Sequence, residues 1–242
     1  MSKRLNKEII LLAFSTSSKR LSVALTKGEK VVKEINQSAG LLHSQKLLPA
    51  IATILSSLCL SIEDIEAFAI DIGPGSFTGL RIGLATLKGL VFGRKKKVIA
   101  VSSLEVLARK TAEHFLSFSL PSCSLFPIID AKQEKVYTAI YTAKKKENKI
   151  VLKRETGYQV LNIRELLRRI KKRKQVVFTG DGIERYQDII LSEKKEIRFA
   201  EHRFWFPYAS VISEIALKKL KRGEVEDIER LSPMYLIPSP FA

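Results

Sequence analysis

The chain has 242 residues, a length that fits one large domain or two small ones. Its composition, 45% hydrophobic and 28% charged, excludes wholesale disorder and a collagen-like or coiled-coil fibre. The net charge of +17 is spread over both halves and attracts polyanions, of which nucleic acid is the commonest. A lineage-wide bias towards lysine is the alternative explanation of this excess.

Cysteine content and hydropathy both favour a cytoplasmic protein without a membrane anchor. Cys59 and Cys123 are too few for a disulfide framework or a cysteine-rich zinc module, and they fit a reducing compartment. No segment approaches the ~18 apolar residues that a membrane helix needs. The apolar run at 9–14 follows a basic start, but it is shorter than the roughly 7–15 residues of a signal-peptide core. We expect it to form a buried strand.

Short apolar or alternating runs predict strands, and apolar residues at helical spacing predict helices. The first half gives strands at 9–14, 21–26, 31–35, 67–72 and 98–101, and helices at 44–58 and 77–92. Pro49 removes a backbone hydrogen bond, so we expect the first helix to kink or restart there. The second half repeats the order, with strands at 125–129, 136–141, 150–154, 176–179 and 196–199, and helices at 163–170, 183–191 and 209–220.

Two βββαβα units in tandem suggest a duplication. The predicted fold class is α/β and resembles the actin-like (ASKHA) two-lobed architecture of actin, sugar kinases and Hsp70. We place the first lobe at 1–109, completed by a C-terminal helix at 207–222, and the second, smaller lobe at 110–206, with a loop near 117–124. The tail at 223–242 has three prolines near its end, and we expect it to lie extended on its own domain.

A glycine-rich segment, IGPGSFTGLRIG at 72–83, follows a predicted strand and opens a predicted helix. Gly73 and Gly75 allow a tight turn, Ser76 or Thr78 can cap the helix, and free N–H groups there would hold an anion. The lysine and spacing of a P-loop are absent, and Thr78 stands where a dinucleotide motif has its third glycine. A purely structural turn is therefore an equal alternative to an anion site.

The two helices of the first half carry more apolar surface than one sheet requires. In the second helix, Gly79 and Gly83 share a face of bare backbone, opposite a face of bulky leucines. Burial within the chain is one explanation of this surplus, and we favour the other, an interface with a partner subunit. The residues expected at that interface are Leu47, Leu48, Ile51, Leu55, Gly79, Leu80, Gly83, Leu84, Leu87 and Val91.

Catalytic constellations are missing from the sequence. The three histidines share no metal-ligand spacing and no Cys/His cluster exists, so we predict no metal site and no catalytic residue. Asp130 and Asp181 end apolar strands, where acids in this architecture often coordinate a metal–nucleotide, which makes Asp130 a candidate nucleotide-proximal residue. The corresponding first-half position is Ser15, which predicts a degenerate nucleotide cleft and argues against a self-sufficient ATPase.

Four segments carry a resemblance to a known family: HSQKLLPAI at 43–51, IGPGSFTGLRIGLATLKGL at 72–90, VSSLEVLA at 101–108 and DAKQEKVYTAIY at 130–141. In this order and spacing they resemble the TsaB family, also called YeaZ. Its bacterial members are needed to make threonylcarbamoyladenosine next to the anticodon of tRNAs. The resemblance covers most of residues 9–141, and PMYL at 233–236 is a weaker echo.

The resemblance implies a non-catalytic pseudo-enzyme that scaffolds and activates a catalytic paralogue, TsaD, through its first-lobe helices. TsaD would hold the metal and transfer the threonylcarbamoyl group, and a TsaE-like ATPase would join, so that ATP and metal belong to the partners and this chain needs no cofactor. Two departures are Ser15 in place of the family's aspartate and Ile237 in place of its C-terminal arginine, and the roles of those two residues do not carry over.

The resemblance also implies that tRNA is met through the complex, and that a homodimer forms when the partner is absent. The candidate basic contacts are the run of Lys144–146, together with Arg94, Lys95, Lys96, Arg168, Arg169 and Lys171. Two other function classes stay open: a stand-alone actin-fold phosphotransferase or peptidase, and a basic module whose main task is binding RNA. The even spread of charge, without an RNA-binding motif, argues against the last.

Overall fold

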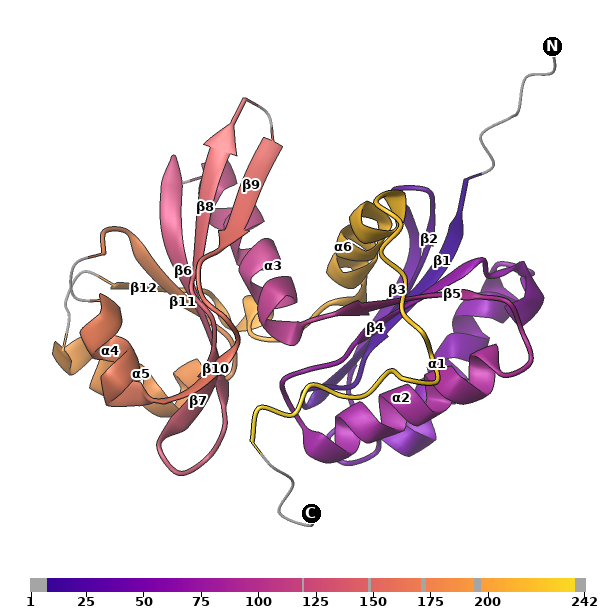
Figure 1. Ribbon diagram of the computed structural model, residues 1–242, viewed down its shortest axis with the longest axis horizontal. Helices are drawn as coiled ribbons and strands as arrows, with labels where there is room; N and C mark the ends of the chain where they lie inside the picture. The colour runs from indigo at the N-terminus through magenta and orange to yellow at the C-terminus, as the bar shows by residue number, and fades with distance from the viewer. Residues whose placement is uncertain (1–7, 119, 148, 171–172, 194–196, 238–242) are drawn as a thin grey trace. The chain divides into compact units, whose positions relative to one another are not determined.

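The computed structural model describes residues 8–118, 120–147, 149–170, 173–193 and 197–237. The chain forms two compact units, each built around its own sheet (Figure 1). The first unit consists of residues 1–101 and 207–233, and the second of residues 102–206 with the residues from Met234 onward.

The first unit is a five-stranded sheet in the order β3-β2-β1-β4-β5. β1 (Ile10–Ser15) pairs antiparallel with β2 (Arg20–Lys27), which pairs antiparallel with β3 (Lys30–Ser38). On the other side of β1, the strands β4 (Ala67–Asp71) and β5 (Lys97–Val101) run parallel to it. The carboxyl ends of β1 and β4 therefore meet at one edge of the sheet.

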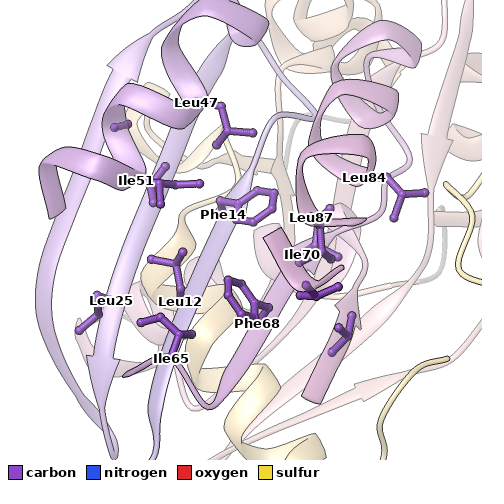
Figure 2. Close-up of a cluster of buried hydrophobic side chains, with 14 of the residues drawn as sticks. Leu12, Phe14, Leu25, Leu47, Ile51, Ile65, Phe68, Ile70, Leu84 and Leu87 are labelled. Atoms are coloured by element: carbon purple, nitrogen blue, oxygen red, sulfur yellow. The ribbon is translucent and has the colours of Figure 1, made fainter. Parts of the chain in front are cut away.

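Helices cover both faces of this sheet (Figure 1). α1 (His43–Ser57) and α2 (Phe77–Val91) lie on one face, and α6 (Ala209–Lys221) packs against β1, β2 and β5 on the other. Alternate residues of β1 serve the two faces: Leu12 and Phe14 join the core under α1 and α2 (Figure 2), whereas Leu11 and Ala13 are buried on the other side. A strand buried on both faces explains the continuous apolar run in the sequence.

The second unit contains α3 (Ser103–Phe118), β6 (Ser122–Asp130), β7 (Lys135–Thr138), β8 (Tyr141–Lys146), β9 (Lys149–Arg154), β10 (Gln159–Asn162), α4 (Ile163–Ile170), β11 (Val176–Thr179), α5 (Gly182–Glu193) and β12 (Ile197–Phe199). β7 and β8 pair with the two halves of β6, while β10 pairs with β7 and β9 pairs with β8. β7 and β8 are thus the two halves of one broken strand, and β10 and β9 are the halves of a second.

With each broken strand counted once, the second sheet has the same order as the first: third, second, first, fourth, fifth. The parallel pairings of β6 with β11 and of β11 with β12 repeat those of β1, β4 and β5. The structure confirms the expected fold class, two tandem α/β units of the actin-like type.

Several boundaries differ from our expectations. The sequence analysis did not predict α3 as a helix. Because α3 packs against β6, the two units divide between Val101 and Ser102. The expected boundary at residue 109 therefore falls inside this helix. The expected loop at 117–124 contains the end of α3 and the start of β6. α1 continues through Pro49, so the predicted restart there is wrong.

The tail beyond α6 packs against the first unit. The backbone N–H of Glu226 donates to the carbonyl of Val98 at 2.8 Å, and Leu231 is buried in the core under α1 and α2. The last expected tail residues, 238–242, lie outside the described residues. No helix in the part of the chain that the structure describes has the length and hydrophobicity needed to cross a bilayer.

Candidate functional site

A buried carboxylate links the ends of β1 and β4. Asp71 is 1% exposed, and its Oδ2 accepts hydrogen bonds from the hydroxyls of Ser15 at 2.8 Å and Ser17 at 2.5 Å. Its Oδ1 accepts from the backbone N–H of Gly73 at 2.9 Å. An acidic side chain is therefore present at this edge of the first sheet. It comes from β4, whereas the residue that the sequence analysis compared with Asp130 was Ser15 of β1. The sequence signal was an aspartate closing the apolar run AFAID.

The glycine-rich turn packs directly against the end of β1. A Cβ atom added to Gly75 would lie 2.3 Å from the carbonyl oxygen of Ser17, and one added to Gly79 would lie 2.0 Å from that of Thr16. At Gly83 it would lie 2.4 Å from Thr16 Oγ1. These glycines let α2 approach the strand more closely than any side chain would permit.

Three N–H groups of this turn already have partners inside the chain. Gly73 donates to Asp71, Ser76 donates its backbone N–H to the carbonyl of Ser17 at 2.7 Å, and Gly79 donates to the Ser76 hydroxyl at 3.2 Å. Ser76 thus caps α2, as predicted. These internal partners favour the structural turn of our two alternatives at Gly73, Ser76 and Gly79, and the anion site stays a prediction for the rest of the turn. Thr78 is exposed beside this turn.

Asp130 lies in the second unit, at the end of β6, where it accepts hydrogen bonds from Lys132 at 2.9 Å and from the Tyr186 hydroxyl at 3.1 Å. Burial works to raise the pKa of Asp130, but the hydrogen bonds and charge of Lys132 outweigh it and lower the pKa. Burial and the nearby carboxylate raise the pKa of Tyr186 to about 12. Asp130 is therefore a charged acceptor already engaged by its own unit.

The predicted interface residues mostly face inward. Figure 2 shows Leu47 and Ile51 of α1 and Leu87 of α2 near Phe14, and Leu84 belongs to the same core. The prediction that a partner contacts these side chains is wrong for the buried residues Leu47, Ile51, Gly79, Leu80, Gly83, Leu84, Leu87 and Val91. Leu55 is partly buried against the same core, and only Leu48 is exposed, at 52%. The glycine face is covered by Thr16, directly after β1, which the sequence pattern could not reveal.

The open side of α1 and α2 nevertheless carries several large apolar side chains and few charges. The two helices pack side by side (Figure 1). Large apolar side chains are exposed beside and on them: Leu41 is 95% exposed, Leu42 45% and Phe92 80%. Small or uncharged residues are exposed along the helices between these ends, namely Ser44, Gln45, Pro49, Ala52, Thr53, Ser56, Ala85 and Gly89. We call this set, with Leu41, Leu42, Leu48 and Phe92, the α1–α2 outer face.

Charged side chains of the two helices turn towards their own chain. Lys46 donates to the carbonyl of Ser38 at 2.8 Å, and Lys88 donates to that of Glu229 at 3.3 Å. The Arg81 guanidinium lies 3.9 Å from the centroid of the Phe77 ring. In a chain of net charge +17, this leaves the α1–α2 outer face unusually poor in charge.

The predicted basic contacts differ in their surroundings. Arg94 forms a salt bridge with Glu63 at 3.0 Å, and Lys96 donates to the Glu63 carbonyl at 2.7 Å, whereas Lys95 is exposed. Arg169 bonds Glu165 at 2.6 Å, and Arg168 is exposed on the same helix. Lys171 lies outside the described residues.

A family model described as TsaD, tRNA N6-adenosine threonylcarbamoyltransferase, matches residues 33–239. The tRNA threonylcarbamoyladenosine biosynthesis protein TsaB of Haemophilus influenzae is 37% identical over 130 residues, which are 53% of this chain and 52% of that protein. The TsaB of Bacillus subtilis is 30% identical over 93% of this chain and 93% of its own length.

A solved structure agrees with these relatives. It is a Pseudomonas aeruginosa protein described as similar to peptidase YEAZ, with 25% identity, 95% of this chain and 100% of that chain covered, and a TM-score of 0.76. The sequence relatives and this fold match lead to one assignment: the chain belongs to the TsaB (YeaZ) family of tRNA threonylcarbamoyladenosine biosynthesis proteins.

Proposed function

We propose that this chain is a non-catalytic subunit in tRNA threonylcarbamoyladenosine biosynthesis, which binds a TsaD-like paralogue through the α1–α2 outer face and holds it in its active form. The observation that carries the proposal is this exposed, charge-poor face on an otherwise strongly basic chain. Soluble proteins rarely expose a large contiguous apolar patch unless another molecule covers it.

The composition of the face suits a protein partner. Stable interfaces commonly bury ~1,200–2,000 Å² in total, with apolar side chains at the centre and few charges. Leu48 and Phe92 offer large side chains, while Ala85 and Gly89 leave the backbone of α2 accessible between them. A helix of the partner could approach closely over these small residues.

Several polar residues that could serve catalysis are engaged in local structure. The Ser76 hydroxyl caps α2, and the rings of His114 and His202 pack within 4.9 Å of Phe204 and Trp205, respectively. Burial raises the pKa of the Cys123 thiol to about 11, far from that of a nucleophile. Among the described residues, no three His, Cys, Asp or Glu side chains gather as metal ligands. These features support a partner role over a stand-alone phosphotransferase or peptidase.

The interface proposal is tested by replacing Gly89 with glutamate. A Cβ at Gly89 meets no atom within 4 Å and the residue is exposed, so the variant should fold, while the new charge would be buried in the contact. We expect binding to the TsaD-like protein to weaken at least tenfold in analytical gel filtration and titration calorimetry. Gly157→Glu is the matched control, because Gly157 is equally unobstructed but lies in the second unit. Equal affinity of both variants would place the interface elsewhere.

The remaining partners follow from the same proposal. Without the TsaD-like protein, two copies would cover the α1–α2 outer face by pairing, so Gly89→Glu should also make the free chain monomeric. The ATP and metal chemistry would belong to the TsaD-like subunit and a TsaE-like ATPase. The purified chain should then neither hydrolyse ATP nor cleave peptides. Turnover that a substitution in this chain abolishes would favour the enzyme alternative.

A further inference from the structure

The basic side chains of this protein fall into paired and unpaired groups. Arg94 and Arg169 are neutralised by Glu63 and Glu165. The β8–β9 hairpin differs: its lysines at 144, 146, 149 and 153 are exposed and form no ion pair with any residue that the structure describes. Two acids adjoin the hairpin: Glu147 is exposed in its turn, and Glu155 is already held by Arg173 at 2.7 Å and by the Thr142 hydroxyl.

These four lysines lie on one face of the hairpin. Side chains alternate between the two faces of a strand, and cross-strand partners share a face. Lys144 is opposite Val151, Lys146 is opposite Lys149, and Thr142 is opposite Lys153. The four lysines therefore surround Val151, which is 49% exposed. Since a strand rises about 3.4 Å per residue, the basic patch extends for roughly 14 Å.

The lysine face is open, whereas the opposite face of the hairpin is covered. Ala143, Ile150 and Leu152 pack into the cluster that α3 covers. α4 and α5 pack over β10, β6 and β11 instead, and the hairpin extends away from them (Figure 1). In the first unit the equivalent pair, β2 and β3, has α1 on one face and α6 on the other. The break in the strands of the second unit leaves the corresponding face without a helix.

We propose that the lysine face of the β8–β9 hairpin binds the sugar-phosphate backbone of RNA. The inference rests on the proposed role in tRNA modification and names the surface that would hold the tRNA. An unpaired lysine patch complements a chain of phosphates and gains affinity by releasing counterions. The face carries no aromatic side chain on which a base could stack, so we expect contacts that position a helical part of the RNA without reading its sequence.

The test compares two variants that each lose four positive charges. The hairpin variant replaces Lys144, Lys146, Lys149 and Lys153 with glutamine. The matched control replaces the exposed residues Lys19, Lys30, Lys33 and Lys97 of the first unit with glutamine. Binding of a fluorescent tRNA transcript is measured by anisotropy between about 50 and 200 mM salt, for the free chain and for its complex with the TsaD-like protein.

We expect the hairpin variant to bind at least tenfold more weakly at about 0.1 M salt, and its slope of log affinity against log salt to be smaller by about 3 to 4, close to one per phosphate contact. The control should stay near the wild type. Should the fourfold variant not unfold cooperatively, the pair Lys146→Gln and Lys149→Gln should lower the slope by about 2. Equal losses in hairpin variant and control, or unchanged tRNA binding by a folded hairpin variant, would overturn the inference.

The same samples separate this inference from the proposed function. Both variants should still co-elute with the TsaD-like protein, because their substitutions lie outside the α1–α2 outer face. If the wild-type chain fails to co-elute, the proposed function fails while the RNA measurement on the free chain stands. If the hairpin variant loses binding to phosphatidylserine vesicles and keeps its tRNA affinity, the face recognises a membrane surface and the RNA proposal is wrong.

Discussion

At the scale of single residues, α2 shows one residue type used in two ways. Gly79 is buried because the carbonyl of Thr16 occupies the place of a Cβ, whereas Gly89 is exposed and meets nothing within 4 Å. The first glycine fixes the distance between α2 and β1. The second leaves a bare patch on the side where we expect a partner.

Alanine substitutions at these two positions should therefore change stability in opposite directions. Gly89→Ala should raise the free energy of unfolding by about 0.5–1 kcal/mol, since alanine favours the helix. Gly79→Ala gains the same propensity but forces a Cβ to within 2.0 Å of a backbone oxygen, and we expect a net loss of about 1–3 kcal/mol. Urea unfolding measures both, and a shift of the same sign in both variants would contradict the close packing of α2 on β1.

The Asp71 cluster predicts non-additive mutations. Asp71→Ala leaves the hydroxyls of Ser15 and Ser17 and the N–H of Gly73 buried without their acceptor, and we expect a loss of about 3 kcal/mol or more. Adding Ser15→Ala and Ser17→Ala removes two of these orphaned donors, so the triple variant should be less destabilised than the sum of its parts by about 0.5–3 kcal/mol in urea unfolding. Strict additivity would mean that the three side chains act independently.

At the scale of elements, α1 begins with a buried histidine. His43 is 4% exposed, its Nε2 has no hydrogen-bond partner among the described residues, and burial lowers its pKa from 6.5. The native state thus holds the ring neutral, even though nearby backbone carbonyls oppose the shift, and the charge of Lys46 adds to it. The unfolded chain takes up a proton near pH ~6.5, before the native chain does.

This difference makes stability depend on pH. The free energy of unfolding should fall as pH drops from about 7 towards 5, because the unfolded state binds more protons over that window. His43→Gln should flatten the decline, which is measured by urea unfolding at each pH. Carboxylates with lowered pKa values, such as Glu155, titrate below their ordinary value of 4.5 and do not obscure the window. An unchanged decline in His43→Gln would remove His43 as its source.

The local sequence pattern predicted which segments form helices and strands better than it predicted which residues pack around them. The buried strands were predictable because apolar runs such as ILLAFS leave no alternative. α3 was predictable in principle from the i, i+4 spacing of Leu104, Ala108, Ala112 and Leu116, a signal that the sequence analysis did not use. The orientation of α2 could not be predicted, because Thr16, which packs against its glycines, is distant in sequence. The pairing of Arg94 with Glu63 and the open lysine face of the hairpin likewise depend on tertiary contacts.

At the scale of the whole molecule, the two units share one strand order but differ in how the chain completes them. The second unit is nearly continuous in sequence, from Ser102 to Phe206, and contains α3 with its whole sheet. The first unit is interrupted: its five strands end at Val101, and α6 returns more than a hundred residues later to cover β1, β2 and β5. Stability of the first sheet should therefore require the C-terminal segment.

The sequence fragment 1–101 should consequently fail to fold by itself, while 102–206 folds. Val211, Ile212, Ile215 and Leu217 are buried in α6, and at about 1.5–3 kcal/mol each their burial contributes roughly 6–12 kcal/mol. That is comparable to the whole stability of a typical domain, about 5–15 kcal/mol, so the sheet cannot lose it and remain folded. Circular dichroism and urea titration should show a cooperative transition for 102–206 and none for 1–101. Adding a peptide of residues 207–237 to the first fragment should restore the transition, and a fragment 1–101 that unfolds cooperatively without it would show that α6 is dispensable.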